Sequence, residues 1–283
     1  MDVRPFGAFE PPARYARLLA FAQRAPDNVV GKQLARFARG LYLWRGPLPA
    51  DVVVENLRMR CWLRDNTCER KFVFTPWRFD VLERRAIAEA LPVGGVFVDV
   101  GANVGIYTLS AAKSLGRAGR IIAIEPYPPA LARLRFNIAA TRGSASEWPR
   151  IDVLPFGVSD RDGPLELRVD GGNLGGGSIT TGDARFTSGG TTATVTVRCR
   201  QLLSIVRELE IDRIDALKID IEGAEDLALG AFLDHAPEFL LPRCLVIENS
   251  DHLWKRDLRE LLVLHGYREI LKTRLNTVLR LGI

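Results

Sequence analysis

A short apolar segment of the chain includes an acidic residue, and two glycines follow this segment. In VFVDVGANVGIYTLSAA (residues 96–112) the apolar segment contains Asp99, and Gly101, Asn103 and Gly105 come before an apolar run with helical spacing. Glycines between a strand and a helix let the backbone approach a ligand without obstruction by side chains. Ligands of doubly wound sheets bind beyond the carboxyl ends of the strands. The stretch therefore predicts a ligand site at residues 99–105.

The acidic residues indicate which ligand this is. Asp99 would repel a pyrophosphate and attract an ammonium group, and GANVG at 101–105 lacks the G-x-G-x-x-G spacing of dinucleotide sites. Glu125 ends the next apolar segment, where an acid can accept hydrogen bonds from both hydroxyls of a ribose. Together these features favour S-adenosylmethionine over NAD. A nicotinamide-dependent oxidoreductase is the alternative on the same architecture.

A second set of charged residues occupies LKIDIEGAE, residues 217–225. In an extended segment Lys218, Asp220 and Glu222 lie on one side. Charges in a covered strand are costly unless they are paired, so we expect Lys218 to pair with Asp220. Glu222 then lies at the end of the strand, where a substrate would bind. Glu225 begins the next helix, where the helix dipole alone favours an acid.

The elements around these residues alternate between apolar segments and helical stretches. We expect strands at 96–100, 121–125, 151–158, 216–221 and 244–249, and helices at 106–115, 129–140, 224–233 and 254–266. Strands this apolar are covered on both faces, which predicts an α/β fold with a mainly parallel sheet and right-handed crossovers. Residues 267–270 and 276–281 are expected to form a hairpin at one edge.

The first 90 residues follow another pattern. Residues 11–43 predict two helices separated near Pro26, residues 52–74 alternate as short strands with a turn at Asp65–Asn66, and 78–95 predict a helix ended by Pro92 and Gly94. We expect residues 1–90 to be an accessory region that caps the substrate and 91–283 to be the catalytic domain. The segment 170–193, rich in Gly, Ser and Thr, is either a surface excursion without a role or a mobile cover over the site, and we favour the cover because it lies between two main strands.

Several motifs resemble those of the FkbM-type S-adenosylmethionine-dependent methyltransferases. They are VDVGANVGIYTLSAA, IIAIEPYPPALARLRFN, LKIDIEGAEDLALGA, FGVSDRDGPLEL and NLGGGSIT. The resemblance implies a Rossmann-like class I methyltransferase fold, with a seven-stranded sheet that has one antiparallel strand. It also implies methyl transfer to an oxygen of a sugar or polyketide-like natural product. By position, it implies cofactor contacts from Asp99, Gly101, Asn103, Gly105, Tyr107, Thr108 and Glu125, and an adenine contact from Ser159 or Asp160.

Such a reaction needs a group that removes the proton of the acceptor hydroxyl. We expect Asp220 or Glu222 to be this base and Glu248, at the end of the next apolar segment, to orient the acceptor. Clustered carboxylates also suit a divalent ion such as Mg²⁺, which would lower the pKa of the hydroxyl. Because no histidine is placed among them, and His252 comes two positions later than in the resembled family, we rank chemistry without a metal first.

Composition bounds the alternatives. The net charge is +5 without a block of like charge, so a nucleic-acid partner is not indicated; the early basic residues are expected to form a solvated helix face. A pI of about 9.2 keeps an RNA or other nucleic-acid methyltransferase as one alternative, although DIEG lacks the polar-Pro-Pro-aromatic loop of base-amine methylation. A non-catalytic cofactor-binding protein is another, and it would have no use for Asp220 and Glu222.

The remaining sequence features concern the cell compartment. The four cysteines have no metal-ligand spacing, which is typical of reduced thiols. The N-terminus lacks the order of a secretion signal, and eighteen apolar residues never run together, so we expect no membrane span and no membrane partner. The sequence thus predicts a cytoplasmic enzyme that acts on a small-molecule hydroxyl acceptor.

Overall fold

The computed structural model describes residues 4–143, 147–170, 173–179 and 192–282. Within these ranges, no helix combines the length and apolar character that crossing a membrane requires.

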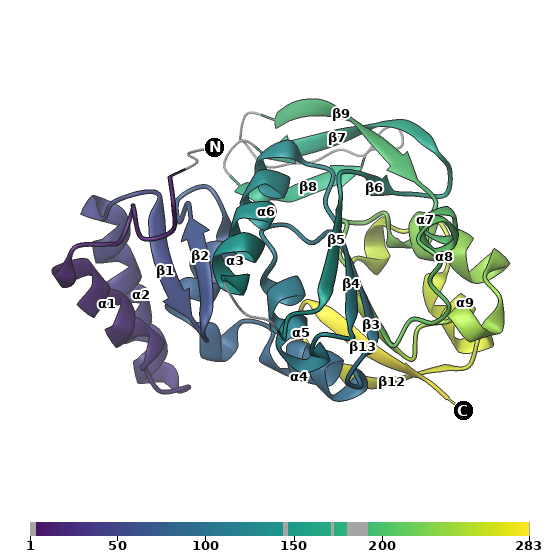
Figure 1. The fold of residues 1–283 in the computed structure, drawn as a ribbon, viewed down its shortest axis with the longest axis horizontal. Helices are drawn as coiled ribbons and strands as arrows, with labels where there is room; N and C mark the ends of the chain where they lie inside the picture. Colours follow the sequence, from purple (N-terminus) through teal and green to yellow (C-terminus); the bar gives the residue numbers. More distant parts are fainter. Residues whose placement is uncertain (1–3, 144–146, 171–172, 180–191, 283) are drawn as a thin grey trace.

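The centre of the fold is a seven-stranded sheet in the order β12-β13-β11-β10-β3-β4-β5 (Figure 1). Its strands are β3 (Val96–Val100), β4 (Arg120–Ile124), β5 (Arg150–Leu154), β10 (Ala216–Ile219), β11 (Cys244–Glu248), β12 (Tyr267–Lys272) and β13 (Asn276–Leu281). β13 is antiparallel to both of its neighbours, whereas β5, β4, β3, β10 and β11 are mutually parallel. The predicted class I methyltransferase sheet, with one antiparallel strand and a C-terminal hairpin, is confirmed.

Helices cover both faces of this sheet because its side chains alternate between two hydrophobic clusters. Phe97 and Ile121 belong to the cluster that also contains residues of helices α4 (Val81–Ala90) and α5 (Ile106–Leu115). Val98 and Ile122 face the other cluster, with α7 (Leu202–Glu208), α8 (Glu225–His235) and α9 (Leu258–Leu264). Helix α6 (Pro128–Arg142) packs on Ala123, on the same face as α5. Apolar strands covered on both faces are thus confirmed.

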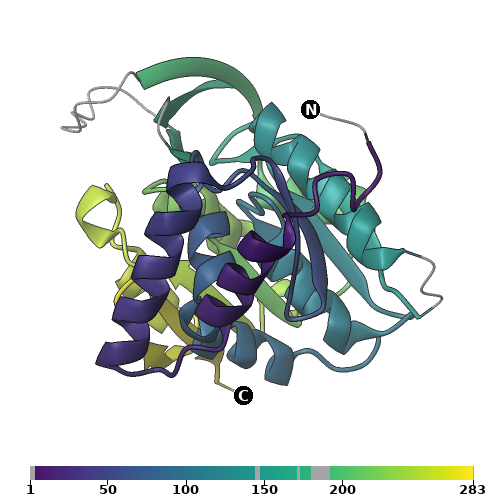
Figure 2. The same cartoon turned by 90° about the vertical axis from the view of Figure 1, so that its left-hand side faces the viewer.

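The N-terminal region begins with the two predicted helices, α1 (Ala13–Gln23) and α2 (Val29–Arg45), which lie side by side at the front of Figure 2. A hairpin of β1 (Ala50–Val54) and β2 (Leu57–Cys61) follows. Its turn is Glu55–Asn56, both with positive φ, as a type I′ turn requires.

The expected strands beyond residue 61 are wrong. The chain does turn near the expected Asp65–Asn66, at residues 62–65, where the backbone N–H of Asp65 donates a 3.1 Å hydrogen bond to the carbonyl of Trp62. Residues Thr67–Phe74 form helix α3, because the side chain of Asn66 accepts a hydrogen bond from the backbone N–H of Glu69 and so caps the helix. A 3₁₀ turn (Pro76–Arg78) connects α3 to α4. Buried side chains of α1, α2 and α3 belong to the same hydrophobic cluster as those of β3 and α5.

A second, four-stranded sheet in the order β6-β9-β7-β8 lies above the main one in Figure 1. It comprises β6 (Gly157–Val158), β7 (Gly163–Asp170), β8 (Asn173–Ile179) and β9 (Thr192–Arg200). The single strand expected at 151–158 is therefore split at Pro155, which has no N–H for a ladder. Residues 171–172 and 180–191 of the expected mobile cover lie outside the described residues, so this expectation stays untested.

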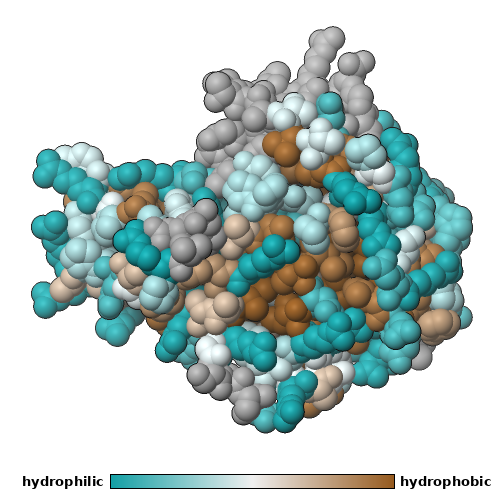
Figure 3. All heavy atoms as spheres, turned by 45° about the horizontal axis from the view of Figure 1, so that its top comes forward, coloured by the Kyte–Doolittle hydropathy of each residue, from teal (hydrophilic) through white to brown (hydrophobic). Residues whose placement is uncertain are grey.

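Seen from the direction of Figure 3, hydrophobic side chains gather near the middle of the visible face and hydrophilic side chains surround them. In edge strand β5, the first residue, Arg150, is exposed and the other four residues are half-buried.

Candidate active site

A cavity of about 250 Å³ opens at the carboxyl ends of β3, β4, β10 and β11. The cofactor loop, which we define as residues 101–105 between β3 and α5, forms one wall. The N-terminal region supplies another through Thr67, Cys68 and Lys71 of α3. The cavity thus lies where ligands bind in open α/β sheets.

The glycines of the cofactor loop allow close contacts between neighbouring elements. Gly101 has φ +74°, and a Cβ there would lie 2.0 Å from the carbonyl oxygen of Asp220. Gly105 has φ +94°, and its Cβ would lie 2.6 Å from Leu134 Cδ1. The sequence predicted a close approach to a ligand; the structure shows that the loop after β3 also packs directly on the loop after β10.

Glu125 is fixed at the end of β4 with its carboxylate against the cavity. Its Oε2 accepts a 2.8 Å hydrogen bond from the backbone N–H of Asn103, and its Oε1 accepts one of 2.8 Å from that of Tyr127. Burial raises the pKa of Glu125 to about 7, although these two N–H groups oppose the shift. Asn103 itself is held in the left-handed region, with φ 49°.

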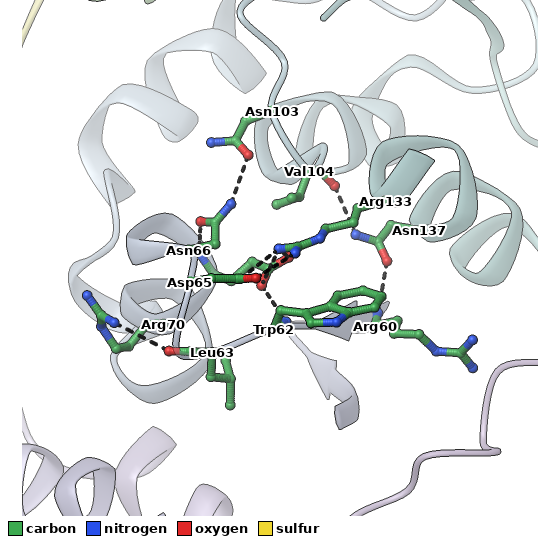
Figure 4. A network of polar contacts seen from close by, with 11 residues as sticks. Arg60, Trp62, Leu63, Asp65, Asn66, Arg70, Asn103, Val104, Arg133 and Asn137 are labelled. Carbon is green, nitrogen blue, oxygen red and sulfur yellow. Dashed lines mark hydrogen bonds and ion pairs between the residues drawn. The ribbon is translucent and has the colours of Figure 1, made fainter. Parts of the chain in front are cut away.

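A polar network from the N-terminal region reaches this loop (Figure 4). Asn66, which is fully buried, donates a 3.0 Å hydrogen bond to the side-chain oxygen of Asn103. Behind it, Arg133 of α6 forms an ion pair with Asp65 at 3.0 Å and one with Glu69 at 3.4 Å, and its guanidinium lies over Trp62. The segment 62–69 is therefore anchored on α6 and on the cofactor loop at once.

Lys218 lies between the two sets of acidic residues. Its ammonium group donates a 2.8 Å hydrogen bond to the carbonyl of Gly101 and lies 3.3 Å from Asp220 Oδ2 and 3.8 Å from Asp99 Oδ1. Burial alone would lower the pKa of Lys218, but Asp220 and Asp99 raise it above its usual value. The predicted pairing of Lys218 with Asp220 is confirmed.

Three carboxylates meet at the cavity. Oxygen atoms of Asp220, Glu222 and Glu248 all lie within 4.8 Å of one another. Burial, together with the charges of Asp220 and its neighbours, raises the pKa of Glu222 to about 8 and that of Glu248 to about 9. Glu222 also has a left-handed backbone, with φ 55°. Such a group of carboxylates can remove a proton or hold a divalent cation.

Glu225 organises the loops that carry this group. Its buried carboxylate accepts hydrogen bonds from the backbone N–H groups of Ile221 and Gly223. It also accepts one of 2.6 Å from the hydroxyl of Ser250 and one of 2.9 Å from the indole N–H of Trp254, beyond β11. From the sequence, the only reason for an acid at Glu225 was the helix dipole. The structure shows that Glu225 connects the loop after β10 to the loop after β11.

The predicted site residues divide into two groups. Those that line the cavity are Gly101, Asn103, Tyr107, Glu125, Asp220, Glu222 and Glu248. Those that lie behind or beside its lining are Asp99, Gly105, Thr108, Ser159 and Asp160. Asp99 is buried and accepts a 2.6 Å hydrogen bond from Thr108, and burial raises its pKa. Direct contacts with the cofactor or the acceptor stay predictions for both groups.

Several lining residues were not anticipated. Phe156, Gly157 and Val158 line the cavity just before Ser159, and Asp80 accepts a 3.1 Å hydrogen bond from the Tyr107 hydroxyl. Burial and nearby Glu83 raise the pKa of Asp80 to about 6. The aromatic residue Phe156 in LPFGV could have indicated from the sequence that this part of the chain forms an apolar wall of the cavity. Nothing in the spacing of Asp80 or Lys71 linked them to residues 99–125.

Two curated proteins are similar to parts of the chain. The AMB antimetabolite synthetase AmbE of Pseudomonas aeruginosa is 30% identical over 217 residues, 62% of this chain and 10% of that protein. The methyltransferase sdnD of Sordaria araneosa is 29% identical over 182 residues, 55% of this chain and 64% of that protein. The chain therefore spans a tenth of the first relative and less than two thirds of the second.

Among solved structures, the FkbM methyltransferase of Methylobacillus flagellatus aligns with a TM-score of 0.40 at 17% identity, covering 95% of this chain and 59% of that one. The O-methyltransferase of Bacillus cereus in complex with SAH aligns with a TM-score of 0.40 at 12% identity, covering 70% and 77%.

The family model described as "Methyltransferase FkbM domain" matches residues 99–269, more than half of the chain. The matched range contains the cofactor loop, Glu125 and the clustered carboxylates of Asp220, Glu222 and Glu248. The chain belongs to the FkbM methyltransferase family.

Proposed function

We propose that this methyltransferase transfers the methyl group of S-adenosylmethionine to a hydroxyl oxygen of a sugar or polyketide-like natural product. The observation that carries the proposal is the meeting of Asp220, Glu222 and Glu248 at a cavity that the cofactor loop also lines. A hydroxyl is a poor nucleophile, so O-methylation needs a carboxylate at this place to remove its proton. A protein that only bound the cofactor would not need one.

The cavity fits the cofactor. Glu125 has both oxygens fixed by backbone N–H groups, so its carboxylate is presented as an acceptor for vicinal ribose hydroxyls. Next to it, Ile124, Phe156 and Val158 offer an apolar surface for a purine ring. When bound, the cofactor would supply a methyl group on a sulfonium: the acceptor oxygen attacks the methyl carbon in line, and the sulfur leaves as a thioether. The protein's own contribution is then to position the acceptor and to remove its proton.

We assign the base to Glu222 and the orientation of the acceptor to Glu248. Asp220 is already paired with Lys218, whereas the pKa of Glu222 is raised towards the range in which a carboxylate is an effective base. The Oε2 atom of Glu248 is buried without a hydrogen-bond partner among the described residues, so a hydroxyl of the acceptor would satisfy it. We rank this chemistry ahead of a Mg²⁺ ion held by the same three carboxylates.

The charge of the cavity bears on the acceptor. Its lining contains five acidic side chains and two lysines: Asp80, Glu125, Asp220, Glu222 and Glu248, with Lys71 and Lys218. Because burial keeps Glu222 and Glu248 largely protonated at neutral pH, the lining offers hydroxyls both donors and acceptors, and it lacks the excess of positive charge that a phosphate backbone requires. This favours a neutral polyhydroxylated acceptor over RNA or DNA.

The test is incubation with methyl-labelled cofactor and a panel of sugars and polyketides, followed by mass spectrometry of the labelled products. Glu222→Gln and Asp220→Asn are compared in single-turnover methylation, with Glu269→Gln, an exposed carboxylate outside the cavity, as the control. We expect Glu222→Gln to be about 10²- to 10⁴-fold slower and the control to be unchanged. Unchanged rates in both cavity variants would remove the base from these residues, and label found only on nucleic acid would overturn the acceptor class.

A further inference from the structure

Helix α2 carries a stripe of exposed apolar side chains. The stripe, which we call the α2 seam, consists of Val30, Leu34, Phe37, Leu41 and Trp44, and these side chains are 38–70% exposed. A helix that simply covers a core would bury its large apolar side chains and expose other residues. Here the buried face of α2 consists mainly of small residues, Gly31, Ala35 and Ala38, together with Tyr42. The larger apolar residues therefore point away from the body of the protein.

The spacing of the α2 seam is that of a helix that packs on another helix. Its members are separated by 4, 3, 4 and 3 residues, which is the a/d repeat of a coiled coil. The pattern is also nearly symmetric about Phe37. In an antiparallel pair of identical helices, Phe37 would meet itself, Leu34 would meet Leu41 and Val30 would meet Trp44.

One charged side chain of α2 lies near the seam, at its C-terminal end: Arg45 is about 60° from the centre of the seam, and its guanidinium lies over the ring of Trp44. The other charged side chains of α2 lie further round the helix. At 100° per residue, Lys32, Arg36 and Arg39 point about 120° or more away from the centre of the seam. Gln33 and Gly40, which flank the seam on its outer side, are uncharged and leave room for close approach. An isologous pairing buries the same patch on both copies and needs no opposite charge on the partner.

We propose that α2 is a dimerisation helix that packs antiparallel on α2 of a second copy of this chain. With its exposed neighbours Phe21 and Val29, the seam offers several hundred Å² of apolar surface, the order of the ~800 Å² that each partner buries in a standard interface. An anionic membrane is the competing occupant, because neither α1 nor α2 contains an acidic residue. The second copy accounts better for the narrow, symmetric seam and for Lys32, Arg36 and Arg39, which lie away from it.

The molar mass in solution tests the proposal. We expect the full chain to sediment at twice its 31.4 kDa mass at micromolar concentration. In Phe37→Glu two carboxylates would meet at the two-fold axis, and we expect the dissociation constant to rise at least ~100-fold. Phe239→Glu, equally exposed outside the seam, is the control and should stay dimeric. Binding of S-adenosylhomocysteine, unchanged in both variants, verifies that they are folded.

A cross-link fixes the geometry. Under mild oxidation, in a Cys68→Ser background, Phe37→Cys should form a disulfide-linked dimer and Phe239→Cys should not. Cys68 is replaced because it is half-buried at the cavity, whereas Cys61, Cys199 and Cys244 are buried. A monomeric wild type would overturn the proposal. So would a dimer that survives Phe37→Glu, which would place the interface elsewhere, and so would a wild type that binds phosphatidylglycerol vesicles through α2 as a monomer.

Discussion

The side-chain amide of Asn66 donates a hydrogen bond of 3.0 Å to the side-chain oxygen of Asn103. Asn66 also caps helix α3, and Asn103 presents its backbone N–H to Glu125. One buried residue of the N-terminal region thus connects a wall of the cavity to the loop and the carboxylate that we assign to the cofactor.

The first prediction concerns this link. Asn66→Ser keeps an oxygen that caps α3 but loses the donor to the half-buried side chain of Asn103. Such a loss costs about 1–2 kcal/mol, so we expect S-adenosylhomocysteine to bind about 5- to 30-fold more weakly by calorimetry. Asn28→Ser, the same change at the cap of α2, is the matched control and should leave the affinity unchanged. Equal affinities in the two variants would contradict the role of Asn66.

The fold was predictable from the chain because its strands are apolar on both faces, and only a covered parallel sheet accommodates them. Asp99, Glu125 and Asp220 could be placed at one edge because parallel strands end together. The helical start at Asn66 could have been read as well, since Glu69 follows three residues later as in a capping box.

Other features depend on contacts that no local pattern encodes. Asp80 reaches the cavity through the hydroxyl of Tyr107, and the ion pairs of Arg133 join it to Asp65 and Glu69, which are more than sixty residues away along the chain. The alternation that put Asp220 and Glu222 on one side ends at Ile219, where β10 ends. Glu222 approaches Asp220 because its backbone is left-handed, which sequence spacing does not show.

The second prediction is a pH profile. Burial raises the pKa of Glu222 to about 8, and only the ionised carboxylate can accept a proton. We therefore expect kcat to rise with pH through about 8 and to level off above it. In Glu222→Gln the residual rate should lose this rise, whereas Glu269→Gln should keep the wild-type profile. A wild-type rate that is constant between about pH 6 and 9, with the chemical step shown to be limiting, would exclude Glu222 as the base.

The third prediction concerns a metal ion. The oxygens of Asp220, Glu222 and Glu248 are close enough to share a divalent cation, but Lys218, at 3.3 Å from Asp220, already supplies a positive charge. We expect methylation to survive exhaustive chelation with EDTA and not to increase on addition of Mg²⁺. Loss of activity that Mg²⁺ alone restores would assign the three carboxylates to a metal site instead.

The fourth prediction is that the acidic cluster costs stability. The pKa of Glu248 rises from 4.5 to about 9 on folding, because burial and the charges of Asp220 and Glu222 disfavour its ionised form. Between these values the unfolded chain is ionised while the folded one holds the proton, so the free energy of unfolding falls as pH rises. Glu248→Gln cannot ionise in either state.

We expect Glu248→Gln to increase the free energy of unfolding by about 1 kcal/mol or more at pH 8, with the gain vanishing near the unfolded pKa of 4.5. Urea denaturation at pH 8 and at about pH 5 measures the difference, with Glu269→Gln as the exposed control. A variant less stable than wild type at pH 8 would show that Glu248 is favourably paired in the folded protein.

The fifth prediction separates positioning from chemistry. Glu225 does not line the cavity, yet it holds the loops after β10 and β11 through Ile221, Gly223, Ser250 and Trp254. Glu225→Gln keeps the shape of the side chain but replaces one acceptor oxygen by a donor, which must then face groups that are themselves donors. We expect the free energy of unfolding to fall by about 2–3 kcal/mol and kcat to fall at least ~10-fold, because the carboxylates on these loops move. The affinity for S-adenosylhomocysteine, which we assign to the loops after β3 and β4, should change less than 3-fold in the same preparation. If kcat stays at the wild-type value in the folded variant, the bridge made by Glu225 has no part in placing Glu222 and Glu248, and the two loops must be held by other contacts.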